Sequence, residues 1–173
     1  LRVLDYTEGA AAGRLPVRRF GVTGEQGSGN HQFKHPSGVC SEPGPLGRVF
    51  VADKNNDRVQ VFTKAGRYVR TIGTGQMGRG NNQFDRPTSV SVEPEPDGHV
   101  FVVDSHNQRV QVLTKDGHFV RTFGITGQLG NGNHQFSHIL NALQKRTGFQ
   151  LNLLVTVQQT AHRHALVGCL QCA

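Results

Sequence analysis

The sequence contains no tryptophan, one methionine and three cysteines among its 173 residues. No apolar run approaches the roughly 18 residues of a membrane-spanning helix, and the first residues lack an apolar stretch of signal-peptide length. Cys40, Cys169 and Cys172 cannot all pair with one another, which argues against a disulfide framework and favours a reducing compartment. We therefore expect a globular, cytoplasmic chain with no membrane partner. Because the chain has no initiator methionine, we also expect it to be a piece of a longer protein.

Positive charge is in excess, but it is concentrated near the two ends of the chain. Residues 20–136 hold twelve Lys and Arg against ten Asp and Glu, whereas residues 137–173 hold three Lys and Arg and no acidic residue. The formal net charge of +7 is therefore weaker support for a nucleic-acid partner than it first suggests.

An internal repeat dominates the middle of the chain. The run DKNNDRVQVF at residues 53–62 returns as DSHNQRVQVL at residues 104–113, which is 51 residues later. Phe33, Phe84 and Phe136 each close a Gly-rich stretch, at spacings of 51 and 52 residues. A fixed period of this length is typical of repeat architectures, and we expect the three Phe side chains to be buried between repeats.

Each period contains four short runs of β-type residues separated by turn signals. The last two runs are joined by a short Gly-containing connection of the kind that closes a β-hairpin. The expected strands are 38–41, 48–53, 58–62 and 68–73 in the first unit, and 89–92, 99–104, 109–113 and 118–124 in the second. Four antiparallel strands in about 50 residues make one propeller blade, so the predicted fold class is all-β.

The motifs distinguish this repeat from other four-stranded repeats. The WD and kelch signatures both need Trp, which the chain lacks. Its own pattern is Phe-x-x-Pro-x-x-Val, a strand ending in Asp, and then Asp-x-x-Asn-x-Arg-Val-Gln-Val. This pattern closely resembles the NHL repeat over residues 33–136 and partially over residues 2–32, and it is similar to the C-terminal domain of the tripartite-motif NHL proteins. The resemblance implies a β-propeller that recognises RNA or protein, in a ubiquitin ligase whose RING, B-boxes and coiled coil lie upstream.

The chain is expected to form only part of a propeller, because a closed ring needs about four to eight blades. Residues 1–32 are interpreted as the end of a preceding blade and an inter-blade loop. Residues 33–83 and 84–135 are interpreted as two whole blades. Residues 136–173 are interpreted as an aborted repeat and an unrelated tail, because Ile139 replaces the motif Pro and nothing later matches. We expect a longer chain to supply the missing blades.

The most repeated polar residues belong to the turn between the second and third strands. We expect the Asp to accept hydrogen bonds from the amides of this turn and the Asn to take a left-handed backbone conformation. The Arg is expected to reach back to the Asp as a charge-assisted pair. These turn residues, for which we predict a structural role, are Asp53, Asn56 and Arg58 in the first unit and Asp104, Asn107 and Arg109 in the second.

Function in a repeat fold usually resides in the loops of one face. The inter-blade loops and the second-to-third-strand turns are expected to share one face, here called the loop face, and to make it basic. The other face, here called the hairpin face, is expected to be acidic because it holds Glu42 to Pro45 and Glu93 to Asp97. The RNA- or partner-binding candidates on the loop face are Lys34, Lys54, Asn55, Arg79, Asn82, Arg86 and His106, beside His31, Asn81 and His134. A basic face with Asn and His suits single-stranded RNA, and a pure protein-interaction scaffold is the alternative.

Signals for a metal or for catalysis are weak. His162, His164, Cys169 and Cys172 have ligand types and an approximate spacing for zinc, but they lie in the tail outside the repeat. No catalytic motif is present, so no cofactor and no enzymatic activity are predicted for these residues. A metal-dependent propeller lyase, another NHL-type protein, is a remote alternative because it needs His from several blades and His106 is the only His in the second-to-third-strand turns.

Overall fold

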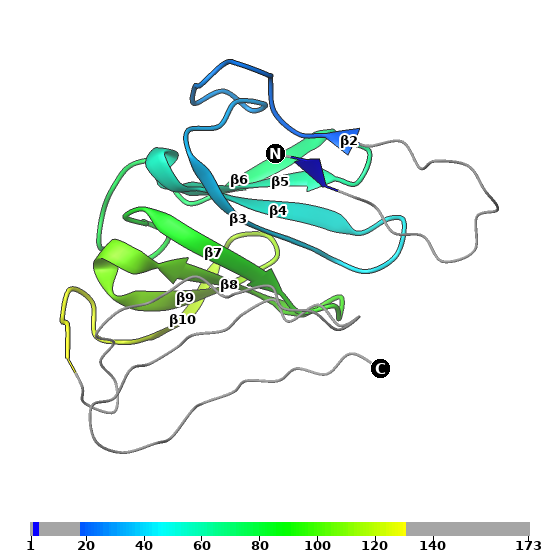
Figure 1. Cartoon of the computed structure of the whole chain (residues 1–173). Helices are drawn as coiled ribbons and strands as arrows, with labels where there is room; N and C mark the ends of the chain where they lie inside the picture. The colour runs from blue at the N-terminus through cyan, green and yellow to red at the C-terminus, as the bar shows by residue number, and fades with distance from the viewer. Residues whose placement is uncertain (1, 4–17, 131–173) are drawn as a thin grey trace.

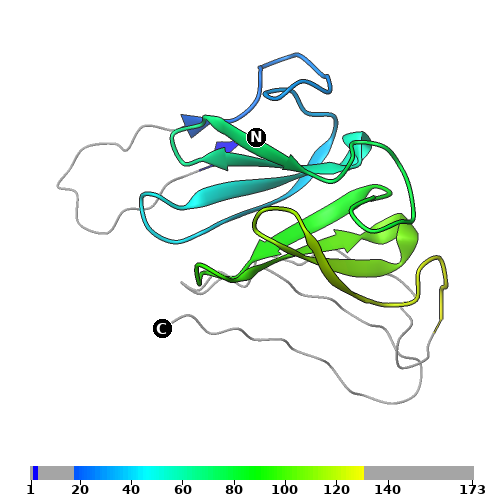
Figure 2. The same cartoon turned by 180° about the vertical axis from the view of Figure 1, so that it is seen from behind.

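The computed structural model describes residues 2–3 and 18–130. A two-stranded pair, β1 (Arg2–Val3) with β2 (Arg18–Arg19), precedes two four-stranded antiparallel sheets. The first sheet contains β3 (Pro36–Ser41), β4 (Arg48–Asp53), β5 (Arg58–Thr63) and β6 (Tyr68–Ile72) in chain order. The second contains β7 (Pro87–Val92), β8 (His99–Asp104), β9 (Arg109–Thr114) and β10 (Phe119–Phe123) in the same arrangement. The two sheets stack face to face as adjacent blades of an incomplete propeller (Figures 1 and 2).

The predicted all-β fold and the two-blade arrangement are confirmed. The predicted second strands match β4 and β8 to the residue, and the third strands extend one residue further, to Thr63 and Thr114. The first strands begin two residues earlier than predicted, at Pro36 and Pro87. Pro is accepted there because the first residue of an edge strand needs no ladder donor, and the register shifts just after each Pro.

Burial on both faces explains the sequences of the central strands. Residues 49–53 of β4 and residues 58–62 of β5 are all buried. One side of the first blade, with Phe50 and Val61, packs on Val100 and Val102 of the second blade. The opposite side packs on Phe20 and Phe33. Two buried faces favour the β-branched and aromatic runs that these strands contain.

The junction between the blades has a tight inner part. Strand β3 lies against β7, and the hydroxyl of Ser37 donates to the carbonyl of Pro87 at 3.1 Å. A Cβ atom at Gly38 would lie 2.8 Å from the Cα of Ser89, so the two backbones approach too closely for a side chain. Phe84 is fully buried in the same junction, as the repeat predicted, and Phe33 is buried on the other side of the first blade. Phe136 lies outside the described residues.

A charged contact joins the blades on the hairpin face. Lys115, from the β9–β10 hairpin, donates to Glu42 in the first blade at 2.8 Å, and both side chains are nearly buried. Glu42 also accepts two bonds from the guanidinium of Arg48, at 3.1 Å each, and one from its backbone N–H at 2.8 Å. Burial alone would raise the pKa of Glu42, but these bonds and the Arg48 charge outweigh it and lower the pKa to about 2.

This contact predicts a pH dependence of stability. A carboxyl whose pKa is lowered on folding contributes stability that is present above its unfolded pKa of about 4.3 and is lost as the pH falls toward about 2. In urea unfolding, the chain should therefore exceed its Glu42→Gln variant in free energy of unfolding at pH 7, and this difference should shrink between pH 5 and pH 2. Glu95→Gln, on the exposed part of the same face, is the control and should change the free energy of unfolding at pH 7 by less than about 0.5 kcal/mol. A Glu42→Gln difference that is constant with pH would contradict this account.

Candidate functional site

The connections between strands divide into the two expected faces. The turns at residues 54–57 and 105–108 lie at the same end of the blades as the inter-blade loops at residues 21–35, 73–86 and 124–130 (left in Figure 1). Backbone bonds join them, since the Asn55 N–H donates to the Lys34 carbonyl and the His106 N–H to the Asp85 carbonyl. The four hairpin connections lie at the other end (Figure 1).

A buried Asp–Arg pair occupies the base of each turn. Asp53 is fully buried, and its Oδ2 accepts the Nε–H of Arg58 at 2.9 Å and the side-chain amide of Asn56 at 2.8 Å. In the second blade Asp104 accepts the equivalent bonds from Arg109 at 2.8 Å and Asn107 at 2.9 Å. Burial raises the pKa of Asp104, and the bonds from the Asp85 N–H, Asn107 and Arg109, together with the charge of Arg109, act against that rise.

The same Arg residues fix the backbone of the Gly-rich loops. The guanidinium of Arg58 donates to the carbonyls of Ser28, Gly29 and Gln32 at 2.6 to 2.9 Å. Gln60 also donates to the Gln32 carbonyl, at 2.7 Å. In the second blade, Arg109 and Gln111 repeat these bonds to the carbonyls of Arg79, Gly80 and Gln83. Buried arginine side chains therefore determine the shape of the loops.

Two details of the predicted turn are wrong. Oδ1 of Asp53 accepts the N–H of Lys34, from the preceding inter-blade loop, and not an amide of its own turn; Asp104 accepts the N–H of Asp85 in the same way. The left-handed residues are Asp57, with φ of 50°, and Gln108, with φ of 54°, and not the Asn residues before them. The Asn backbone lies inside a three-residue 3₁₀ turn, and its side chain is needed to bind Asp and a loop carbonyl.

The candidate binding residues lie on the loop face as expected. Lys34, Asn55, Arg79, Arg86 and His106 are exposed, whereas Lys54 and Asn82 are half-buried. Among the other loop-face residues, His31 and Asn81 are exposed, and His134 lies outside the described residues.

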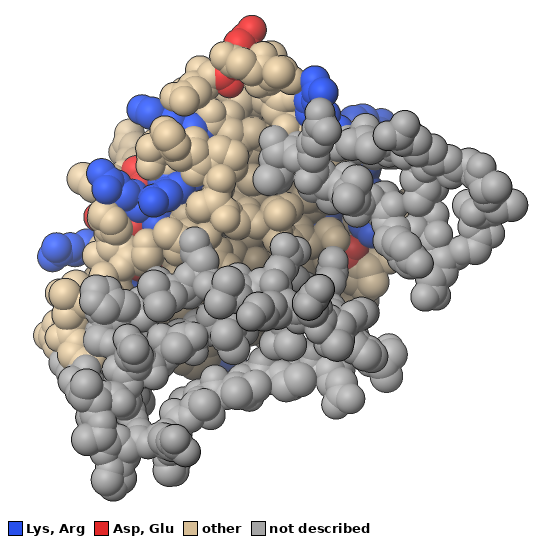
Figure 3. Space-filling model, in the orientation of Figure 1, with Lys and Arg blue, Asp and Glu red and all other residues tan. Residues whose placement is uncertain are grey.

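The expected separation of charge between the faces is wrong. Asp57 and Asp85 lie among the basic residues of the loop face: the first accepts the N–H of Arg86 at 2.8 Å, and the second lies 3.5 Å from His106. Figure 3 shows Lys and Arg at the left edge with acidic residues between them. On the hairpin face, Lys115 stands among the acidic residues. The prediction counted the basic residues of the loop face and omitted the acidic residues Asp57 and Asp85, which lie in the same turns and loops.

His35 is a loop-face residue that the sequence analysis did not single out. It is the counterpart of Arg86, each lies directly before the Pro that begins the first strand, and both have positive φ, 54° and 52°. The Arg86 backbone is held between the turns, because its N–H donates to Asp57 and its carbonyl accepts the hydroxyl of Ser105 at 2.8 Å. Both side chains are exposed. The repeated position before Pro was the available signal.

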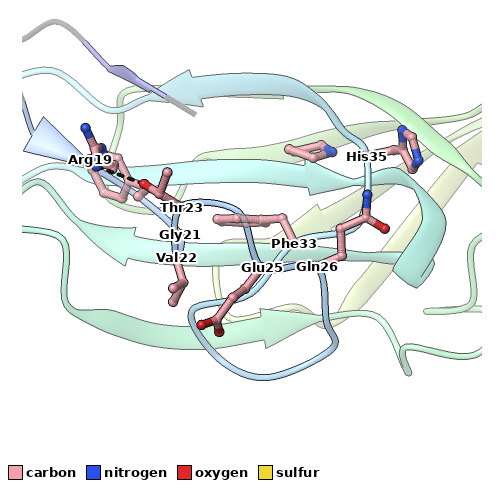
Figure 4. A pocket seen from close by; sticks show the side chains of 10 residues that line it. Arg19, Gly21, Val22, Thr23, Glu25, Gln26, Phe33 and His35 are labelled. Carbon is pink, nitrogen blue, oxygen red and sulfur yellow. Dashed lines mark hydrogen bonds between the residues drawn. The ribbon is translucent and has the colours of Figure 1, made fainter.

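A hollow of about 320 Å³ lies beside the first blade, between Phe20, Phe33, His35 and Pro36 (Figure 4). Arg19 and Thr23 at its rim are hydrogen-bonded at 2.8 Å. In the second blade, the equivalent Pro87 is covered by β3 of its neighbour. The hollow is therefore the counterpart of a blade junction, and its shape gives no reason to treat it as a ligand site.

The zinc candidates His162, His164, Cys169 and Cys172 lie outside the described residues. Within residues 2–3 and 18–130, no three His, Cys, Asp or Glu side chains gather as metal ligands would. Cys40 is buried, and burial together with the charge of Glu42 raises the pKa of its thiol, which keeps the thiol protonated. In the same part of the chain, no helix is long and apolar enough to cross a membrane.

Comparison with known proteins agrees with the geometry. The family model of the NHL repeat matches residues 33–62 and 84–113, which run from the buried Phe of each blade to one residue before the end of its third strand. The chain carries two NHL repeats. The resemblance recognised in the motifs is thereby confirmed.

Three known proteins are each similar to part of the chain. The chain is 34% identical over 103 residues to "Protein brain tumor" of Drosophila melanogaster, covering 60% of this chain and 10% of that protein. It is 42% identical over 65 residues to "Protein lin-41" of Caenorhabditis elegans, covering 38% of this chain and 5% of that protein. It is also 33% identical over 104 residues to "Peptidylglycine alpha-amidating monooxygenase" of Rattus norvegicus, covering 58% and 10%. The chain therefore spans a tenth or less of these relatives.

The buried pair predicts a large effect of one substitution. Arg109→Met should lower the free energy of unfolding by about 3 to 5 kcal/mol, because it leaves the Asp104 carboxylate buried without its charged partner and removes three bonds to loop carbonyls. Urea unfolding measures the change. Arg67→Met, at an exposed hairpin position, is the control and should change stability by less than about 0.5 kcal/mol. Equal losses of unfolding free energy in the two variants would show that the buried Asp–Arg pair does not stabilise the blade.

Proposed function

We propose that these NHL blades are a recognition module that binds single-stranded RNA through the loop face. The supporting observation is that Arg79 and Arg86 extend from loop backbone that side-chain hydrogen bonds hold in place, with Lys54 in the adjoining turn. Arg79 gives its carbonyl to Arg109, and the backbone of Arg86 is bonded to both turns. Side chains on a fixed backbone bind with a smaller loss of conformational entropy than side chains on a mobile loop.

The residue types favour contacts to phosphates over base stacking. Lys and Arg bind phosphate oxygens, whereas Asn55, Asn82 and His106 offer hydrogen bonds to the edges of unstacked bases. The aromatic residues of the described inter-blade loops, Phe33 and Phe84, are buried and offer no platform for a base. We therefore expect moderate affinity with a strong dependence on salt.

The wider role follows from the resemblance to the tripartite-motif NHL proteins. We propose that the chain is part of a ubiquitin ligase of that type, in which the blades select the target. Any ligase activity then belongs to an upstream RING domain outside these 173 residues. The loop face is expected to be completed by blades that the longer chain supplies.

The proposal is tested by replacing Lys54, Arg79 and Arg86 together with Ala. Binding of a fluorescent oligouridine is followed by anisotropy at several salt concentrations. The triple variant should lose most of the affinity, and the slope of log K against log salt should flatten by about two units, because each lost contact to a single strand removes about 0.7. The unfolding midpoint of the variant verifies that the blades remain folded.

A matched variant on the other face is the control. The control replaces Lys64 and Arg67 of the β5–β6 hairpin and Arg70 of β6 together with Ala. This removes the same charge from the opposite end of the blades. This control should keep the parent affinity and salt slope. If both triple variants lose affinity equally, binding reflects net charge alone and the loop-face site is refuted.

A protein partner is the second candidate, and a separate observation favours it. Met77 and Leu129 occupy equivalent positions on two inter-blade loops, and their side chains are 69% and 62% exposed. Apolar side chains exposed on a binding face are typical of protein interfaces. If the triple variant binds oligouridine as the parent does, while Met77→Ser with Leu129→Ser abolishes capture of a protein partner, the protein candidate replaces the RNA proposal.

A further inference from the structure

The last hairpin of the second blade makes three contacts with the first blade. Lys115 binds Glu42 at 2.8 Å, and Asp116 binds Arg70 at 2.6 Å. The third contact is between Gly117 and Ile72. Gly117 lies so near Ile72 that a Cβ atom added to it would be 3.4 Å from the Cγ1 atom of Ile72. The Lys-Asp-Gly turn therefore binds to three residues on the hairpin face of the first blade, Glu42, Arg70 and Ile72, here called the hairpin acceptor.

The Lys115 contact is the strongest of the three. Its side chain is 6% exposed and that of Glu42 is 11% exposed, whereas the Asp116 and Arg70 side chains are 61% and 38% exposed. Lys115 also donates to the carbonyl of Glu95 in its own blade, so its ammonium is positioned before it meets the neighbour. A desolvated, preorganised pair contributes more than an exposed one.

The second blade carries the same acceptor 51 residues later, as Glu93, Arg121 and Phe123. Glu93 is held as Glu42 is, by the N–H and the side chain of the residue six positions on, here His99 at 2.8 and 2.9 Å. Both bonds go to Oε2, and no described residue donates to Oε1, the atom whose counterpart in Glu42 receives Lys115.

The remaining two parts of this acceptor are exposed. Phe123 is 44% exposed, although its counterpart Ile72 is 1% exposed beneath the Lys-Asp-Gly turn. The Arg121 guanidinium lies 5.3 Å from the centre of the Phe123 ring. Burial would raise the pKa of Glu93, but the bonds and charge of His99, with a smaller contribution from the charge of Arg121, lower it.

We propose that Glu93, Arg121 and Phe123 form a second hairpin-acceptor site, and that its ligand is the Lys-Asp turn of another four-stranded blade. Glu93 forms an ion pair with the Lys, Arg121 forms an ion pair with the Asp, and the Phe123 ring packs against the turn. The first blade of a second copy does not match this site, because its hairpin reads Lys64-Ala65 and lacks the Asp. Residues 131–173 contain no Lys-Asp pair, so the ligand comes from outside this chain.

The site is tested with the full chain and a labelled hairpin peptide. The probe is a disulfide-closed peptide with the sequence of residues 109–123, and a second peptide has the Lys and Asp exchanged. Fluorescence anisotropy should show that the Lys-Asp peptide binds about tenfold more tightly than the exchanged peptide, because only the Lys-Asp peptide can form both charge pairs. Equal binding of the two peptides, or no binding of either, overturns the proposal.

Variants of the chain locate the peptide site. Glu93→Gln with Arg121→Gln should abolish the preference for the Lys-Asp peptide. Asp97→Asn with Arg67→Gln removes one acid and one base at exposed positions of the same face and should leave the preference unchanged. A preference that persists in the first variant places the peptide elsewhere and overturns the assignment. Far-UV circular dichroism of both variants verifies that the sheets are retained.

Discussion

The ion pair between the Asp that ends the second strand and the Arg that begins the third is the contact on which the loop face depends. A carboxylate buried as completely as Asp53 or Asp104 is costly unless it is paired and hydrogen-bonded. Here the paired Arg uses its other N–H groups to bind carbonyls of the Gly-rich loop. The Arg of each ion pair therefore also holds the backbone of the Gly-rich loop, which contains few apolar side chains that could hold it by packing.

This arrangement separates the framework from the recognition surface. The buried Asp, Asn and Arg are the same in both blades, whereas the exposed positions differ: Asn55 becomes His106, and His35 becomes Arg86. Asn55 and His106 donate the same backbone bond to the preceding inter-blade loop, and His35 and Arg86 have the same positive φ. A loop residue can therefore change its chemistry without altering the backbone, which is what a recognition module built from repeats requires.

The strands and the ion pair were predictable from the sequence because the repeat places them at fixed spacing. The contacts that join different blades were not, because the repeat gives no register between a hairpin such as Lys115 and a loop such as Glu42. The charge of the loop face was overestimated for a different reason: Asp57 and Asp85 lie in the turn and the inter-blade loop of that same face, and only its basic residues were counted. The hydrogen bond from the Lys34 N–H to Asp53 was also missed, because the two residues are 19 positions apart in the chain.

Amide hydrogen exchange of Lys34 and Asp85 tests the central claim most directly. Each N–H lies in a loop but donates to a buried carboxylate at 2.7 Å. Both should exchange nearly as slowly as the amides of β4 and β8, and at least about a hundredfold more slowly than the exposed loop residue Asn81. In Arg58→Met, the Lys34 amide should lose this protection while Asp85 keeps it. Exchange of both amides as fast as Asn81 in the unaltered chain would show that the buried pairs do not hold the loops.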